Sequence, residues 1–97
     1  MKEEIELKII ELIGLLDYLL AIDNFPAYHQ IKDKYSKLLI ILKSRKNIQE
    51  IKNGDFDIIQ SVYRLIGEAP PKDSFLGNYI SNKMQGIYNI QKEIVKD

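Results

Sequence analysis

His29 is the one histidine of the chain, and it is the residue best suited to proton transfer or metal binding. It follows Tyr28, and the chain contains no cysteine. A histidine beside a carboxylate can transfer protons near neutral pH, but a usual zinc site needs several His or Cys ligands. The sequence contains no recognisable Ser-His-Asp arrangement and no glycine-rich phosphate loop. We therefore predict no catalytic residue, no metal site, no cofactor and no enzymatic activity.

Carboxylates occur in two close pairs, Glu3-Glu4 and Asp55-x-Asp57. A di-metal helical bundle needs inward glutamates and a Glu-x-x-His spacing on paired helices. Pro26, and no carboxylate, stands three residues before His29. The motif is missing, so the sequence argues against a di-iron protein.

Six tyrosines are a second set with possible function, at positions 18, 28, 35, 63, 79 and 88. A tyrosine ring can pack at the edge of a core while its hydroxyl stays in water. Tyrosine is also enriched at the energetic centres of protein interfaces. We interpret them as residues at the edge of the core, and a recognition surface remains the alternative.

Charge is unevenly distributed along a chain whose formal net charge is zero. Residues 1–25 carry −4, residues 26–52 carry +5 and residues 53–97 carry −1, counting two bases against six acids, seven against two and five against six. The basic segment 32–52 could contact phosphates. It contains no nucleic-acid-binding motif, so we interpret it as a solvated helix face that complements the acidic first segment, and nucleic acid is an unlikely partner.

Helical spacing predicts the elements that must position these residues. Apolar residues recur every three or four positions over 2–22, 27–43, 55–67 and 74–95, which is typical of amphipathic helices. Residues 44–53 could add a short helix, and Asn53-Gly54 reads as a helix stop with Asp55 as the following cap. The expected fold is all-α: an antiparallel bundle of four main helices in a single domain, 1–97. The predicted inner face includes Ile9, Leu16, Leu39, Leu42, Ile59, Val62, Leu65, Ile80 and Ile87.

Composition supports a globular chain. The 97 residues are 45% hydrophobic and 29% charged, which suits one domain with a core of its own. Acidic residues interrupt the amino-terminal apolar run, so we expect neither a signal peptide nor a membrane-spanning helix. We read the protein as cytoplasmic, with no membrane association.

The order of turns and helices in the carboxyl-terminal half carries a resemblance. It reads IKNGDFDIIQSVYRLIGEAPPKDSFLGNYI from Ile51, with an IKxGD turn, a short helix, a GxxPPxDSF loop and an apolar helix. This half resembles small all-helical bacterial proteins encoded beside polymorphic toxins, some of which are immunity proteins. Ala69-Pro70-Pro71 stands where those proteins have a more glycine-rich loop. The resemblance implies a non-catalytic immunity protein that binds and neutralises a cognate bacterial toxin.

Acidic inhibitor surfaces often meet basic clefts, and the loops offer charged residues for such contact. The predicted partner-binding residues are Asp23, Asp55, Asp57, Glu68, Lys72 and Asp73. The segment 67–73 reads first as a hinge between helices, and its charges suggest part of a binding rim. Two alternatives stay open: a self-associating helical module that forms a homodimer through its broadly apolar first helix, and a small nucleic-acid-binding adaptor.

Overall fold

The computed structural model describes residues 2–22, 26–62 and 74–95, and it is helical almost throughout. Residues 60–62 continue the second 3₁₀ helix as α-helix, and the described residues contain no strand. The prediction of an all-α fold with four main helical segments is confirmed. The elements in chain order are α1 (Lys2–Ile22), α2 (Pro26–Lys43), the 3₁₀ helices η1 (Ile48–Glu50) and η2 (Asn53–Ile59), and α4 (Ser74–Ile94).

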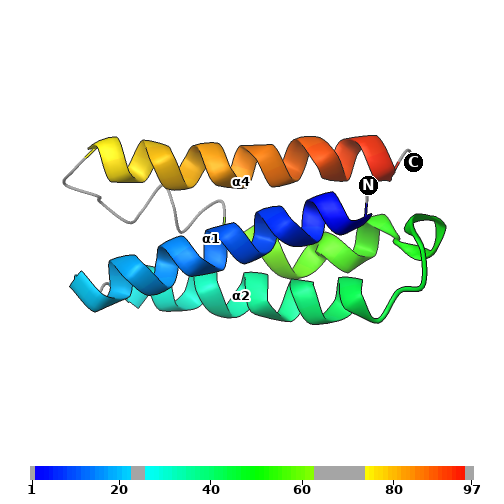
Figure 1. Ribbon diagram of the computed structural model, residues 1–97, viewed down its shortest axis with the longest axis horizontal. Coiled ribbons are helices and arrows are strands. Elements are labelled where there is room, and N and C mark those ends of the chain that lie inside the picture. Colours follow the sequence, from blue (N-terminus) through cyan, green and yellow to red (C-terminus); the bar gives the residue numbers. More distant parts are fainter. Residues whose placement is uncertain (1, 23–25, 63–73, 96–97) are drawn as a thin grey trace.

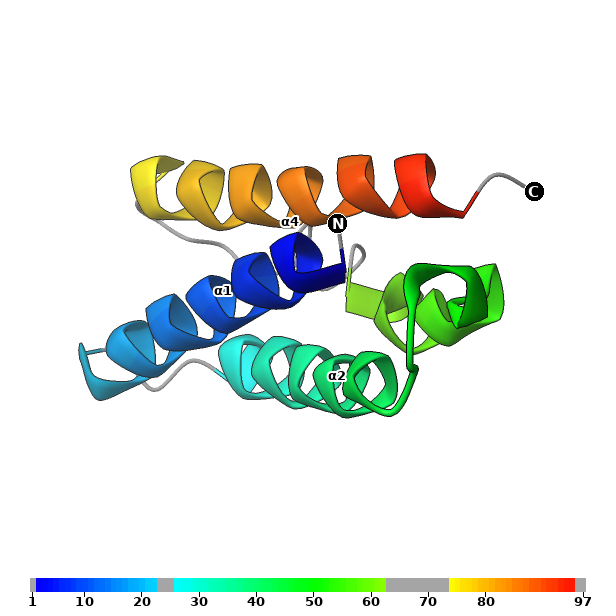
Figure 2. The ribbon, with the colours of Figure 1, turned by 45° about the vertical axis from the view of Figure 1, so that its right-hand side comes forward.

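Helix α1 is the central element of the bundle. It lies between α2 and α4 and runs antiparallel to both, as Figures 1 and 2 show. Helix η2 packs against α2. The long helices lie side by side, and the molecule is elongated, with dimensions of 40 × 22 × 18 Å. None of the described helices is long and apolar enough to cross a membrane.

Local sequence explains where α2 begins and ends. Pro26 is its first residue, where a fixed φ angle fits the helix and the missing N–H would have no partner in any case. Its last residue is Lys43, a cation beside the negative end of the helix dipole. The Ser44 hydroxyl then donates a 2.6 Å hydrogen bond to the Ile41 carbonyl, which satisfies one of the last acceptors.

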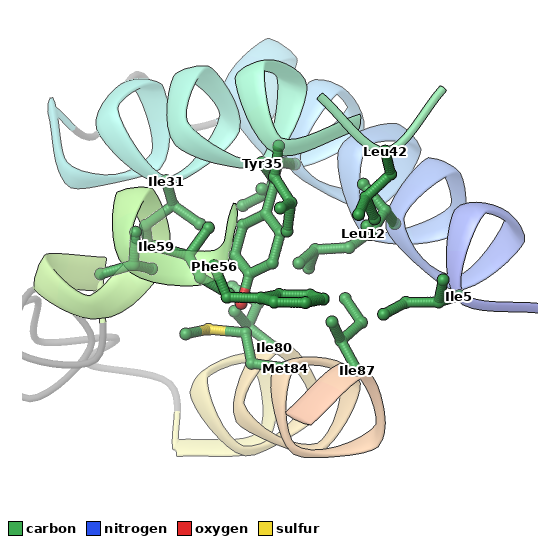
Figure 3. Close-up of a cluster of buried hydrophobic side chains, with 14 of the residues drawn as sticks. Ile5, Leu12, Ile31, Tyr35, Leu42, Phe56, Ile59, Ile80, Met84 and Ile87 are labelled. Atoms are coloured by element: carbon green, nitrogen blue, oxygen red, sulfur yellow. The ribbon is translucent and has the colours of Figure 1, made fainter. Parts of the chain in front are cut away.

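The core is built from one face of each long helix, closed by side chains from η2 (Figure 3). Five residues of α1, Ile5, Ile9, Leu12, Leu16 and Leu19, are buried in it. Phe56 and Ile59 of η2 lie among side chains of α2 and α4 in Figure 3. Phe56 therefore anchors η2 to the other helices of the bundle.

Most of the predicted inner face is buried, and one residue differs. Leu39 is only partly buried, because α2 directs its neighbour Leu38 to the centre of the core. Leu65 lies outside the described residues. The remaining seven predicted positions are buried: Ile9, Leu16, Leu42, Ile59, Val62, Ile80 and Ile87.

The predicted helix stop at Asn53-Gly54 is wrong. Both residues belong to the first turn of η2, and Gly54 does not take the left-handed conformation that a helix-ending glycine uses. Asp55 is consequently inside the element and does not precede it. The expected short extra helix over 44–53 exists as the single turn η1.

Candidate binding surface

The most prominent surface feature is a row of exposed apolar side chains on the outer face of α1. Leu7, Ile10, Tyr18 and Ile22 are 59%, 45%, 64% and 66% exposed. Gly14 occupies the gap between Ile10 and Tyr18, so these five residues follow one another at helical spacing of three or four. We call them the outer stripe. Helix α1 therefore has two apolar faces, and the core covers only one of them.

Two acids on the outer face of α1 form ion pairs with the neighbouring helices, Asp17 at one edge of the outer stripe and Glu11 at helical spacing between Leu7 and Tyr18. Asp17 pairs with Lys32 of α2, and the Glu11 carboxylate lies 3.3 Å from the Lys83 ammonium of α4. Such exposed pairs add little to stability. They do place a cation beside each of the two acids on this face.

Two surface hollows flank α1. One of about 300 Å³ lies at the amino-terminal end of the outer stripe and is lined by Glu3, Glu6, Leu7, Ile10 and Lys43. The second, of about 310 Å³, lies between α1 and α4 and has a more polar lining that includes Lys8, Asn82 and Gly86. The first hollow therefore extends the apolar surface of the stripe towards the end of α2.

The structure describes two of the six predicted partner-binding residues, Asp55 and Asp57. Asp57 is exposed on η2, where its Oδ1 accepts a 3.5 Å hydrogen bond from the Gln60 amide. Asp23, Glu68, Lys72 and Asp73 lie outside the described residues. The partner-binding role of all six therefore stays a prediction.

Asp55 is partly buried and forms a bidentate ion pair with Arg45. The Arg45 Nη2 and Nε groups donate hydrogen bonds of 2.7 and 3.1 Å to the two carboxylate oxygens. The backbone N–H of Lys52 donates a third bond of 3.0 Å to Oδ2. The two bonds from Arg45 join the start of the α2–η2 connection to η2. Asp55 still takes part in the cap of η2, but from inside the first turn and not from the position before the helix that the sequence predicted. The hydrogen bonds from Arg45, with its positive charge, lower the pKa of Asp55 below its usual range.

We predict that Asp55→Asn destabilises the protein in a pH-dependent way. The folded-state pKa of Asp55 is lowered, so its ion pair stabilises the fold above the unfolded pKa of about 3.9. That stabilisation is lost as the pH falls through the lower, folded-state pKa. Urea unfolding of both proteins should show a constant difference near neutral pH that shrinks below about pH 4.

Asp57→Asn is the matched control, because Asp57 lies on the same helix and is exposed. It should change stability little at any pH. A difference between the Asp55 variant and the native chain that persists unchanged in acid would contradict a role for the carboxylate charge.

The basic segment 32–52 is partly neutralised by carboxylates. Three of its seven cations are in ion pairs: Lys32 with Asp17, Lys37 with Asp33, and Arg45 with Asp55. The Lys32 pair joins the basic segment to the acidic first helix, as the charge distribution predicts. Phosphate binding by this face would have to compete with these pairs.

The tyrosines divide between core and surface. Tyr28 and Tyr35 are buried, whereas Tyr18, Tyr79 and Tyr88 are exposed and Tyr63 lies outside the described residues. Tyr35 is fully buried and so does not sit at the core edge as expected. Only Tyr18 belongs to the outer stripe. The sequence signal for that stripe was a second set of apolar residues at helical spacing in the first helix, which the sequence prediction described only as broadly apolar.

Comparisons with protein-family models, curated proteins and solved structures gave no match for this chain. Among the described residues, no three His, Cys, Asp or Glu side chains gather as a metal site would require.

Proposed function

We propose that the protein is a non-catalytic protein-binding module and that the outer stripe of α1 is its interface. The exposure of this stripe is the observation that supports the proposal. Helix α1 already buries five large apolar residues in the core, yet it presents four more to solvent on the opposite face. Large apolar side chains that gather on one exposed face are typical of interaction sites.

The composition of the outer stripe suits a protein partner. Its aliphatic side chains gain from leaving water, at about 25 cal/mol per Å² of apolar surface buried. Tyr18 adds an amphipathic ring of the kind that anchors interfaces. Asp17 and Glu11 on this face are each paired with a lysine of a neighbouring helix, so neither enters an interface as a lone charge.

The resemblance of the carboxyl-terminal half to toxin-immunity proteins suggests a bacterial toxin as a cognate partner. An inhibitor of this class acts by covering a surface of its target, so it needs an interface and no active site. Asp57, exposed on η2, is available for contact with a basic cleft. We do not propose nucleic acid as the partner, because the basic segment 32–52 contains no nucleic-acid-binding motif and three of its seven cations, Lys32, Lys37 and Arg45, are in ion pairs with carboxylates.

We predict that Tyr18→Ala weakens protein association without unfolding the chain. Sedimentation should be measured for the chain alone and for its mixture with the protein encoded by the adjacent reading frame. In whichever sample a complex forms, the variant should weaken it about 30-fold or more, as for an interface anchor. Stability should change by about 0.5 kcal/mol or less, because Tyr18 is exposed.

Tyr88→Ala is the control, since Tyr88 is an exposed tyrosine of α4 outside the outer stripe. It should leave the complex intact. A complex that withstands Tyr18→Ala would show that the stripe is not the interface. The absence of a complex in both samples would contradict the protein-binding function.

A further inference from the structure

We propose that a second copy of this chain covers the outer stripe, with the two α1 helices crossing antiparallel on a two-fold axis at Gly14. The inference rests on the proposed role of the stripe as a protein interface and names its occupant. Four properties of the described residues support it: the position of Gly14, the symmetry of the stripe, the compensated charges on its face and its area.

Packing within the bundle does not explain why residue 14 is a glycine. A glycine inside a helix costs about 1 kcal/mol relative to alanine. A Cβ atom added at Gly14 would have no neighbouring atom within 4 Å, so the bundle itself does not need a small residue there. At the crossing point of two helices, however, the missing side chain allows the backbones to approach closely.

The outer stripe is nearly symmetric about Gly14. Ile10 and Tyr18 lie four residues to either side, and Leu7 and Ile22 lie seven and eight residues away. An antiparallel two-fold crossing would therefore place Ile10 against the partner's Tyr18, and Leu7 near the partner's Ile22. A two-fold interface requires this self-complementary arrangement of one surface patch. The antiparallel orientation also opposes the two helix dipoles favourably.

The charges on the outer face of α1 are compatible with self-association. Glu11 and Asp17 are three residues to either side of Gly14, so the crossing brings each near the other acid of the second copy. Each acid already has its own lysine, Lys83 or Lys32. The contact would thus bring together two ion pairs and no uncompensated carboxylates. The zero formal net charge of the chain adds no overall repulsion.

The area is at the lower end of what a specific dimer needs. Four large side chains exposed by about half to two thirds offer roughly 450 Å² per copy, on the scale of a functional apolar patch. Two copies with Gly14 and the edge residues would bury about 1,000–1,200 Å², close to the minimum for a biological interface. We therefore expect a dimer that dissociates on dilution through about the micromolar range.

Gly14→Ala tests the crossing point, because the substitution acts in opposite directions on the fold and on the dimer. Added helix propensity should raise the thermal stability of the monomer. The two methyl groups would meet on the axis and should weaken dimerisation about tenfold or more by analytical ultracentrifugation.

Gly86→Ala is the matched control for this substitution. Its new Cβ would make only ordinary contact with Lys8 Cδ, at 4.0 Å. It should give a similar gain in monomer stability and leave dimerisation unchanged. Equal dimerisation by both variants would contradict a crossing at Gly14.

A single introduced cysteine provides a second measurement, because the chain has none of its own. Gly14→Cys should weaken dimerisation as Gly14→Ala does, but at a protein concentration that still populates the dimer it should form an intermolecular disulfide under mild oxidation, since the axis would bring two α-carbons within the usual bonding range of about 4.4–6.8 Å. Gln30→Cys, at an exposed position of α2, should cross-link far more slowly. Equal rates at the two positions would contradict the proposed axis.

The oligomeric state of the native chain separates this inference from the proposed function. A chain that stays monomeric at every concentration, yet forms a Tyr18-dependent complex with the adjacent-frame protein, would overturn the dimer and leave the binding function in place. A chain that forms neither complex would overturn both.

Discussion

Replacing Phe56 with alanine should lower the free energy of unfolding by about 3–5 kcal/mol, the usual cost of truncating a buried aromatic residue. Phe56 is only 1% exposed, and its ring lies near Ile80, Met84 and Ile87 of α4 in Figure 3. The truncation would remove the aromatic contact between η2 and the other helices. Because small domains have only about 5–15 kcal/mol of total stability, the loss would be a large share of it.

Ile58→Ala is the matched control for the Phe56 variant. Ile58 lies on the same helix and is only partly buried, so its truncation should cost clearly less. Urea denaturation of both variants gives the comparison. Similar losses for the two would mean that η2 does not present Phe56 to the core as described.

Leu16→Ala should cost about 2–5 kcal/mol, for a different reason. Leu16 is fully buried on the central helix α1, which contacts both α2 and α4. Its truncation leaves a cavity between packed helices that can close only partly, and the free-energy cost grows with the volume that remains.

Leu7→Ala provides the same substitution on the opposite face of the same helix. Leu7 belongs to the exposed outer stripe, so the monomer should lose about 0.5 kcal/mol or less. Both variants should be unfolded at a concentration where sedimentation shows a monomer, because dimerisation would otherwise add to apparent stability. A neutral Leu16 variant would mean that the faces of α1 are misassigned.

The bounds of the long helices could be predicted closely from sequence. The pattern predicted 2–22, 27–43 and 74–95, and the structure has α1 at Lys2–Ile22, α2 at Pro26–Lys43 and α4 at Ser74–Ile94. The reason is local: apolar spacing of three and four residues fits only the period of an α-helix, and Pro26 marks a helix start. The buried face of α1 follows from the same spacing.

The third segment could be predicted only in part, because its geometry departs from the α-helical period. A 3₁₀ helix has three residues per turn, so Phe56 and Ile59 lie on the same face. The α-helical spacing used for prediction placed Ile59, Val62 and Leu65 on the inner face and passed over Phe56. Short-range sequence does not show which period a segment this short will adopt.

The role of Asp55 also depended on contacts between segments. Sequence alone offered it as a helix cap and as a partner-binding acid, since either role needs only an acid in a loop. The fold brings Arg45, ten residues earlier, within 2.7 Å of its carboxylate. Which cation meets which acid is decided by the path of the connecting chain, and charge counts along the sequence cannot show it.

For this protein, the sequence by itself determined the helical class, the positions of the long helices and the apolar residues that could form a core. Periodicity is a local property, so one chain is enough to read it. Only the tertiary structure decided how much of the apolar surface of α1 is covered. Helices α2 and α4 cover the face around Leu12 and Leu16, and they leave the outer stripe from Leu7 to Ile22 in solvent, because two neighbours packed against one side of a helix cannot enclose it.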